Sequence, residues 1–240
     1  MEIRVLSWNI WQGKRREEVL AYLGEQNADI VGLQEVPSQT DHNLAGEIAD
    51  SLEYHYAYYP SIATTDNTGR GNAVLSRYPI VHSMCHFLSP SVAYDGSPTT
   101  EPRIAVQVDL SIDDSIITVL STHLSYTAHF GPSTVAALQT DTLMRLTRNK
   151  AKLILMGDFN ALPDSDTVRA ISSVLKHTDS ALSAPTWTMY PHEYLNHRET
   201  RLHDRIDYIF TSRDISVRAF EVGMSKGASH LPIWAILDVG

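Results

Sequence analysis

Short apolar runs recur along the chain with the spacing of β-strands. Residues 105–110 alternate between apolar and polar side chains, which is typical of a strand with one face toward water. Residues 31–33 and 153–156 are continuously apolar, as in strands that are covered on both faces. The pattern predicts strands at residues 3–8, 29–36, 54–59, 73–76, 104–110, 116–122, 153–156, 206–211, 217–222 and 232–239.

Apolar residues with helical spacing lie between some of these strands. Val19, Leu20 and Leu23 share one side of a helix predicted over residues 14–26. Further helices are predicted at residues 44–52, 133–150 and 168–175, the last with Asp164, Ser165 or Asp166 as its N-terminal cap. Because strands outnumber helices, a simple strand–helix alternation does not fit. Two sheets packed on each other, with helices outside, fit better.

Two polar segments, residues 89–102 and 187–204, predict long loops. Long loops in compact domains are often functional. The chain shows neither an internal repeat nor a low-complexity linker. We therefore predict a single domain over residues 1–240.

Polar side chains follow several of the predicted strands. Each has an ordinary explanation as a turn cap, a solvated loop residue or a structural histidine. Together they suggest one site, because the ends of neighbouring strands can meet at one edge of a sheet, where α/β proteins commonly bind ligands. The residues in question are Asn9, Glu35, His123, Asp158, Asn160, Asp207 and His230.

These residue types suit hydrolysis with a divalent cation. Mg²⁺ takes oxygen ligands and needs only one or two carboxylates besides a substrate phosphate. Glu35 is the best first carboxylate and Asp158 a candidate second. Asn9 and Asn160 can contact a phosphoryl oxygen without adding negative charge.

Asp207 and His230 suit an acid–imidazole pair. The carboxylate would fix the tautomer of the ring and favour its protonated form. Such a pair can act as a general base or as a cation facing developing charge. No serine, threonine or cysteine stands out as a nucleophile beside a base, which favours direct attack by water.

The charge of the chain narrows the range of partners. There are 19 Lys and Arg residues against 28 Asp and Glu, a net charge of −9. This argues against binding nucleic acid by broad phosphate neutralisation. A nuclease that grips a few phosphates locally, or an enzyme of small phosphoesters, remains compatible.

The single cysteine, Cys85, rules out a disulfide within the chain, which fits a reducing compartment. The N-terminal residues lack the pattern of a signal peptide, and no apolar run approaches membrane-spanning length. We therefore expect a cytoplasmic protein with no membrane span. We also expect a monomer.

The motifs of the chain resemble, in order, those of the endonuclease/exonuclease/phosphatase superfamily of DNase I-like, metal-dependent phosphoesterases. SWNIWQG resembles the family's Asn motif and DIVGLQEV its Glu motif. The blocks that follow are GNAVLSRYPI, EPRIAVQVDL, STHLSY, MGDFNALPDS and RIDYIFTS. The QE, GDFN and DYIF elements in this order are the most specific, and the resemblance runs over almost the whole chain.

The resemblance implies a four-layer α/β/β/α sandwich that hydrolyses phosphoesters with Mg²⁺ or Mn²⁺. We prefer DNA, RNA or a nucleotide as substrate, although family members also cut inositol phosphates and sphingolipids. By position it implies catalytic roles for His230, Asp207, Asp158, Asn160 and His123, substrate contacts for Asn9, Arg103, Asn160 and His123, and metal contacts for Glu35, Asn9 and Asp158.

Two positions depart from the family pattern. Ser229 stands where an Asp normally precedes the histidine, unless one residue is deleted and the register is restored at Pro232. The missing carboxylate keeps open an alternative, a catalytically impaired relative that binds a phosphorylated ligand or partner. Trp11 stands where members acting on abasic DNA often carry Asp, which disfavours abasic-site repair.

Some further residues allow two interpretations. Lys14, with the two arginines that follow it, suits either a phosphate contact or a solvated helix face. Trp187 and Tyr190 are candidates for substrate specificity. A zinc site is conceivable for three histidines, but their spacing matches no compact ligand motif, and we interpret them as loop residues near the substrate. They are His192, His197 and His203.

Overall fold

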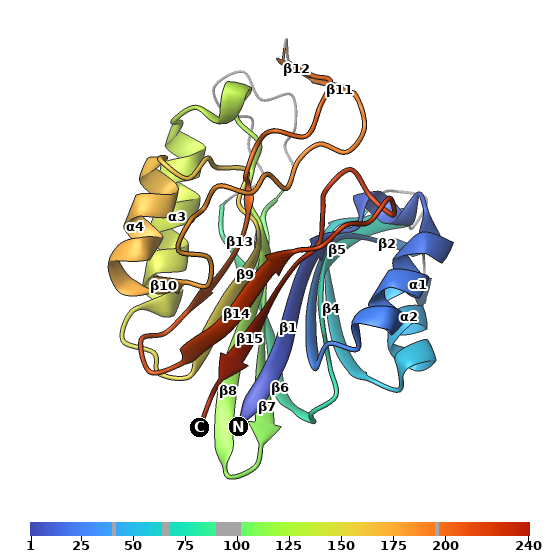
Figure 1. The fold of residues 1–240 in the computed structure, drawn as a ribbon, viewed down its shortest axis with the longest axis vertical. Helices are drawn as coiled ribbons and strands as arrows, with labels where there is room; N and C mark the ends of the chain where they lie inside the picture. Colours follow the sequence, from blue (N-terminus) through green and yellow to red (C-terminus); the bar gives the residue numbers. More distant parts are fainter. Residues whose placement is uncertain (40–41, 64–67, 90–101, 195–196) are drawn as a thin grey trace.

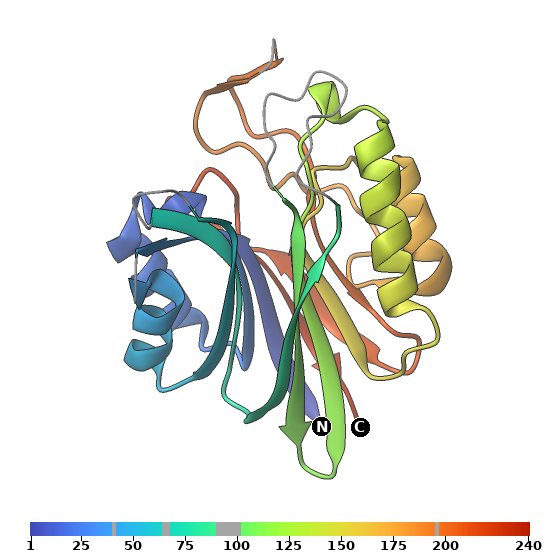
Figure 2. The same cartoon turned by 180° about the vertical axis from the view of Figure 1, so that it is seen from behind.

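Two β-sheets packed face to face form the centre of the molecule (Figure 1). The computed structural model describes residues 1–39, 42–63, 68–89, 102–194 and 197–240. Two helices cover the outer face of each sheet, and the view from behind shows the same arrangement (Figure 2). The layers follow the order α/β/β/α, which confirms the predicted sandwich.

The first sheet combines the N-terminal strands with the last two strands of the chain. Its order is β14-β15-β1-β2-β5-β4, and β3 pairs with β2. β1 and β2 are parallel, and their pairing ends where Asn9, the last residue of β1, lies opposite Gln34. The strands are β1 (Glu2–Asn9), β2 (Ile30–Gln39), β3 (His42–Asn43), β4 (His55–Ala63), β5 (Thr68–Ser76), β14 (Ser216–Val222) and β15 (Ile233–Asp238).

The second sheet repeats this plan with strands from the middle of the chain. Its order is β10-β13-β9-β8-β7-β6. β8 and β9 are parallel with His123 opposite Asp158, and Asp207 of the antiparallel β13 also pairs with Asp158. The strands are β6 (Ile80–Phe87), β7 (Ile104–Ile112), β8 (Ser115–His123), β9 (Leu153–Asp158), β10 (Lys176–His177) and β13 (Asp207–Thr211). A separate hairpin consists of β11 (His192–Tyr194) and β12 (His197–Glu199).

The helices begin where the sequence offers caps. Among the candidates, Ser165 caps α4, because its hydroxyl accepts a hydrogen bond from the Val168 N–H at 3.2 Å. Ser133 caps α3 in the same way. The helices are α1 (Arg16–Gln26), α2 (Leu44–Leu52), α3 (Thr134–Thr147) and α4 (Asp166–Val174), with short 3₁₀ turns η1 (Trp11–Gly13) and η2 (Ala128–Phe130).

The main hydrophobic core lies between the two sheets. Val5 and Ile30 of the first sheet belong to the same buried cluster as Val106, Met156 and Ile209 of the second. Two further clusters lie beneath the helix pairs, so most strands are covered on both faces. A core shared by both sheets is the packing that a single domain would need.

The structure corrects three expectations about local structure. β7 does not turn one whole face to water: Gln107 is buried and bonded to His86 and Asp109. β6 was not predicted, because Val81, Met84 and Phe87 are exposed on an edge strand without a clean apolar pattern. The segment 187–204 contains the β11–β12 hairpin rather than only loop.

Most of the other predicted loop, residues 89–102, lies outside the described residues. In the part of the chain that the structure describes, no helix is both long enough and apolar enough to cross a membrane.

Candidate active site

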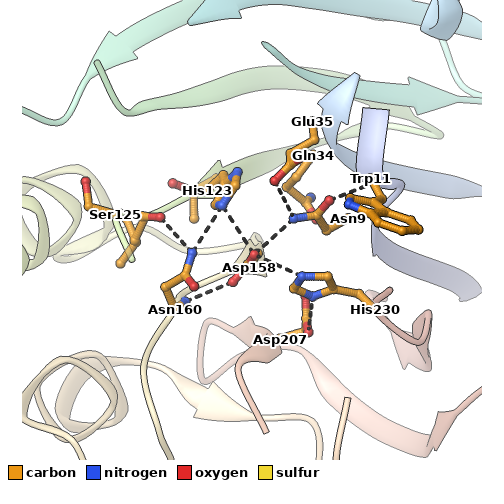
Figure 3. Close-up of polar contacts among 12 residues, drawn as sticks. Asn9, Trp11, Gln34, Glu35, His123, Ser125, Asp158, Asn160, Asp207 and His230 are labelled. Atoms are coloured by element: carbon orange, nitrogen blue, oxygen red, sulfur yellow. Dashed lines mark hydrogen bonds and ion pairs between the residues drawn. The ribbon is translucent and has the colours of Figure 1, made fainter. Parts of the chain in front are cut away.

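The predicted site residues gather at one end of the sandwich, where the parallel strands of both sheets stop (Figure 3). β1 and β2 deliver Asn9 and Glu35 from the first sheet. β8 and β9 deliver His123 and Asp158 from the second. Asp158 lies in the middle of the group. Residues that are far apart in sequence therefore meet because each sheet carries one parallel pair that ends in polar residues.

A β-bulge turns Glu35 toward this centre. The pairing of β2 with β5 shifts between Leu33 and Val36, and Glu35 adopts a left-handed conformation with φ 53°. Gln34, just before it, points between the sheets and donates to the Ser121 hydroxyl of β8 at 3.1 Å. Under regular alternation Glu35 would face away from the second sheet, so the bulge re-aims its carboxylate.

Asn9 connects the two carboxylates across the sheets. Its amide nitrogen donates to Asp158 Oδ2 at 3.0 Å and to Glu35 Oε1 at 3.4 Å. Its amide oxygen accepts the Trp11 backbone N–H at 3.0 Å, which fixes the orientation of the amide. Asn9 therefore presents N–H groups to the carboxylates, and the metal contact predicted for it would require the amide to leave Trp11.

At the GDFN motif, β9 approaches β8 very closely, and this close approach positions the polar residues of the motif. A Cβ on Gly157 (φ 149°) would lie 1.9 Å from the Thr122 carbonyl oxygen, so only glycine fits. Asp158 Oδ1 then accepts the Asn160 backbone N–H at 2.9 Å. The Asn160 amide donates to the Leu124 carbonyl at 3.0 Å and lies 3.1 Å from His123 Nε2.

Asp207 and His230 form the acid–imidazole pair that the sequence predicts. His230 Nδ1 lies 3.0 Å from Asp207 Oδ2, and its Nε2 lies 3.6 Å from Asp158 Oδ2. The Trp8 indole N–H holds the His230 backbone carbonyl at 2.9 Å. All three titratable groups are buried, with ligand atoms within 4.8 Å of one another.

Burial and mutual charge shift the pKa values of these groups. Burial raises the pKa of Asp158 to about 7, against the opposing charge of His230 and with the help of Asp207. Burial would lower the pKa of His230, but the Asp207 and Asp158 carboxylates outweigh it and raise this pKa to about 9. Burial, then Arg103 and His230, hold the pKa of His123 well below its usual range. At neutral pH His230 is a cation and His123 is neutral.

A cavity of about 340 Å³ opens in front of the group. Glu35, Asp158, Asn160 and His230 are among the residues that line it. Three cations also reach it although the chain is acidic overall, which suits an anionic group of a substrate. They are Lys14, Arg70 and Arg103.

Ser229 also lines this cavity, directly before His230. It is buried, and its backbone carbonyl accepts the Met189 N–H at 2.7 Å. The position that normally carries an Asp in the family therefore faces the same space, with a hydroxyl in place of a carboxylate. The remaining cluster of Asp158, Asp207 and His230 is complete without it.

Aromatic rings form another part of the cavity wall. Trp11 and Trp187 line it, together with Tyr126. Trp11 is stacked on Tyr190 with centroids 5.7 Å apart, and the Lys14 ammonium lies 4.0 Å from the Trp11 ring centre. Lys14 thus faces the cavity as well as solvent. Tyr190 does not line the cavity itself but packs against Trp11, which does.

Sequence reasoning missed Gln34 and Arg70. The signal for Gln34 was its position inside a continuously buried strand, where a polar side chain needs partners. The signal for Arg70 was the flanking pair Gly69 and Gly71 in TGRGN: a Cβ on Gly71 would lie 2.0 Å from the Tyr59 carbonyl oxygen. Neither signal identifies a functional role without the fold.

The donor set fits a hard divalent cation. Glu35 and Asp158 present carboxylate oxygens that share one amide donor and face the cavity. Oxygen ligands beside open space are what Mg²⁺ and Mn²⁺ accept.

Comparisons with known proteins agree with this construction. The family model described as Endonuclease/Exonuclease/phosphatase family matches residues 6–234. Comparison with curated proteins found no significant match. Among solved structures, an endonuclease/exonuclease/phosphatase from Bacteroides vulgatus superposes with a TM-score of 0.75 and 18% identity, covering 100% of both chains.

Two other solved structures show the same fold. The human Nocturnin catalytic domain with bound sulfate has a TM-score of 0.72 and 21% identity, over 100% of this chain and 95% of that one. A mannosyl-6-phosphatase from Bacteroides thetaiotaomicron has a TM-score of 0.72 and 20% identity, over 98% and 99%. The match of the family model over nearly the whole chain shows that this protein belongs to the endonuclease/exonuclease/phosphatase family.

Proposed function

We propose that the protein is a divalent-metal-dependent phosphoesterase that hydrolyses phosphodiester or phosphomonoester bonds by attack of water. The observation that carries the proposal is the meeting of Glu35, Asp158 and the Asp207–His230 pair at one cavity. Members of this family are hydrolases of phosphoester bonds, which supports the reaction class.

Glu35 and Asp158 would hold Mg²⁺ or Mn²⁺. When bound, the ion would supply Lewis-acid stabilisation of the charge on the phosphoryl oxygens. Asn9 keeps the two carboxylates at a fixed separation by donating to both. In this role Asn9 positions the ligands rather than binding the ion.

Asp158 and Asn160 would position the attacking water. Asp158 is buried at the centre of the group, where the Asn9 amide donates to its Oδ2. The Asn160 backbone N–H holds the other oxygen of Asp158, so the acceptor is fixed in orientation. Asp158 is therefore our candidate for the general base.

His230 would act as a fixed cation. Asp207 orients its ring and keeps it protonated at neutral pH. A preorganised positive charge stabilises the charge that develops on the phosphoryl group. Arg103 and the neutral His123, which also line the cavity, would contact other oxygens of the same group.

The cavity wall favours a nucleotide or the end of a nucleic acid. Bases stack on aromatic rings without regard to sequence. Trp11, Tyr126 and Trp187 offer such rings beside Lys14 and Arg70. Names of structural neighbours do not decide the matter, because one is a mannosyl-6-phosphatase.

A panel of phosphoesters tests the proposal. DNA, RNA, nucleotides, sugar phosphates and lipid phosphoesters would be incubated with the parent protein and Mg²⁺ or Mn²⁺. We expect hydrolysis of at least one class and a loss of about 10²–10⁴-fold in His230→Gln. His82→Gln, at an exposed histidine of β6 outside the site, is the control and should keep the parent rate.

The alternative, a phosphate-binding relative without activity, is motivated by Ser229 in the cavity wall. Calorimetric titration separates the two functions. If the parent binds a nucleotide but neither Mg²⁺ nor Mn²⁺, and hydrolyses nothing in the panel, the binding function replaces the proposed one.

A further inference from the structure

The segment 187–204 forms a closed unit beside the cavity. Its two ends are bonded to each other: the Trp187 N–H donates to the Asp204 carbonyl, and the Asp204 N–H donates to the Trp187 carbonyl, each at 2.9 Å. The β11–β12 hairpin lies between these ends and rises above the sheets (Figure 1). Trp187 also pairs with His230, so this unit is attached to the catalytic pair.

Three side chains of this unit converge inside it. His197, Glu199 and Asp204 each offer one ligand atom, and these atoms lie within 4.8 Å of one another. Glu199 is 7% exposed and Asp204 is 8% exposed. Two carboxylates buried so closely together repel each other when both are ionised, and His203 Nδ1 lies near both, 2.9 Å from Asp204 Oδ1 and 3.6 Å from Glu199 Oε2.

Each of the three residues has one polar atom engaged elsewhere. Asp204 Oδ1 lies 2.9 Å from His203 Nδ1. Glu199 Oε1 accepts the Thr200 N–H at 3.0 Å. His197 Nδ1 lies 3.0 Å from the Nδ1 of His129. These contacts fix the side chains, and the other oxygen of Glu199, Oε2, lies 3.6 Å from His203 Nδ1.

Two of the remaining atoms are buried without a hydrogen bond. Within the described part of the chain, neither His197 Nε2 nor Asp204 Oδ2 has a hydrogen-bond partner. Buried polar atoms are nearly always satisfied, so a ring nitrogen and a carboxylate oxygen left open in one cluster point to an absent partner.

The chemistry of the donors selects the kind of partner. An imidazole nitrogen combined with carboxylate oxygens is a typical ligand set for Zn²⁺, whereas Mg²⁺ prefers oxygen alone. A tetrahedral zinc ion separates its ligand atoms by about 3.4 Å, so the three side chains need only close in slightly. We propose that His197, Glu199 and Asp204 bind a divalent transition-metal ion of the zinc class, at a site separate from the catalytic centre.

His203 and His129 complete the surroundings. His203 Nδ1 contacts Asp204 and lies 3.6 Å from Glu199 Oε2, so it holds both carboxylates in place. His129 contacts the imidazole of His197 through its Nδ1 and holds that ring in place. Second-shell partners of this kind orient metal ligands and tune their affinity.

The ion would fix one wall of the substrate cavity. The His197 ring is stacked on Trp187, with centroids 5.8 Å apart and planes at 20°. Trp187 lines the cavity and contacts the catalytic histidine through its backbone. Metal binding therefore orders the wall without touching the reacting groups, and its loss should raise KM more than it lowers kcat.

Titration of the full chain with Co²⁺ tests the site directly. Mg²⁺ is present in excess to fill the oxygen site, and the visible ligand-field bands of tetrahedral Co²⁺ are recorded. We expect one equivalent of Co²⁺ to give these bands and Zn²⁺ to remove them. His197→Gln and Asp204→Asn should each weaken binding by more than about 10-fold.

Two controls make the result specific. Glu193→Gln removes an exposed carboxylate from the same hairpin and should leave the Co²⁺ titration unchanged. Glu35→Gln removes the proposed catalytic ligand and should also leave it unchanged, so failure of the proposed hydrolase function and failure of this site are distinguishable. Circular dichroism checks that each variant is folded, and Glu199→Gln replaces any variant that is not.

The absence of tetrahedral bands in the parent would overturn the proposal. So would Co²⁺ binding of equal strength in the parent and in every folded variant of the three ligands.

Discussion

The strand-tip site and the hairpin cluster are two acidic, histidine-containing groups built in opposite ways. The first takes Glu35, Asp158 and His230 from strands and loops of both sheets, where buried backbones fix each side chain. The second takes His197, Glu199 and Asp204 from one short segment above the sheets. Catalytic geometry needs positions held within a fraction of an ångström, which paired strands provide. A local segment lacks that support, which is a reason for it to need an ion.

The two groups also differ in the ions they suit. Oxygen donors facing an open cavity favour Mg²⁺ or Mn²⁺, and a half-buried imidazole with two buried carboxylates favours the zinc class. The comparison can be tested by making matched changes in the two groups.

The largest difference should appear in the loss of kcat when each of two aspartates, three positions apart in the chain, is replaced by asparagine. Asp207→Asn removes the partner that orients and charges His230, and we expect kcat to fall by about 10²–10⁴-fold. Asp204→Asn should lower kcat by less than about 10-fold, because this residue contacts no reacting group. Steady-state kinetics on the preferred substrate measure both. Equal losses in kcat would show that the two groups are one functional unit.

The second largest effect should be on how the free energy of unfolding changes with pH. Asp207 and Asp158 raise the pKa of His230 to about 9, above the value near 6.5 in the unfolded chain. The resulting stabilisation is complete below pH 6.5 and is lost as the pH rises through 9, with a total on the order of 3 kcal/mol.

Urea unfolding with a chelator present, at pH values from 6 to 10, measures this. The free energy of unfolding of Asp207→Asn should lie below that of the parent by the largest amount at pH 6, and the gap should shrink toward pH 10. A gap that is independent of pH would mean that His230 is not charged in the folded protein.

A smaller effect, on metal affinity, should also distinguish the strand-tip site from the hairpin cluster. Glu35→Gln should weaken Mn²⁺ binding by at least about 10-fold and leave Co²⁺ binding in the presence of Mg²⁺ unchanged, whereas Glu199→Gln should do the reverse. Calorimetry with each ion gives the two affinities. If each variant weakens both ions, the assignment of separate sites is wrong.

The smallest effect concerns the framework beneath the strand-tip site. Ser121→Ala removes the hydroxyl that accepts from Gln34 across the sheets, and we expect a loss of about 1 kcal/mol in the free energy of unfolding. The hairpin cluster should bind Co²⁺ as before. Urea unfolding and Co²⁺ titration of the same preparation check the two statements.

The sequence predicted the sandwich and its strand tips because buried strands leave a strong apolar pattern. The run ending at Met156 is fully buried, and Asp158 follows it at the carboxyl edge as expected. The order of the motifs then identified the family. Position in a strand was enough to foresee which polar residues meet, although the roles of the individual residues stay predictions.

Edge strands and backbone irregularities could not be predicted in the same way. β6 exposes Val81 and Phe87, so it lacks the alternation that marks a half-buried strand. The bulge at Glu35 depends on pairing with β5, which one strand's sequence does not encode. Trp187 and Asp204 close their segment through backbone bonds, which carry no residue signature. The spacing of residues along the chain therefore gave no sign that Glu199 and Asp204 approach His197.

The amide of Asn9 spans the seam between the two sheets, with Glu35 on one side and Asp158 on the other. Sliding one sheet over its neighbour by a fraction of a strand repeat would separate these carboxylates while leaving every strand intact. The rate of the proposed hydrolysis would therefore depend on how the two sheets are aligned. A change in the packing between the sheets, far from the cavity, would then lower the rate of the proposed hydrolysis without blocking the substrate cavity.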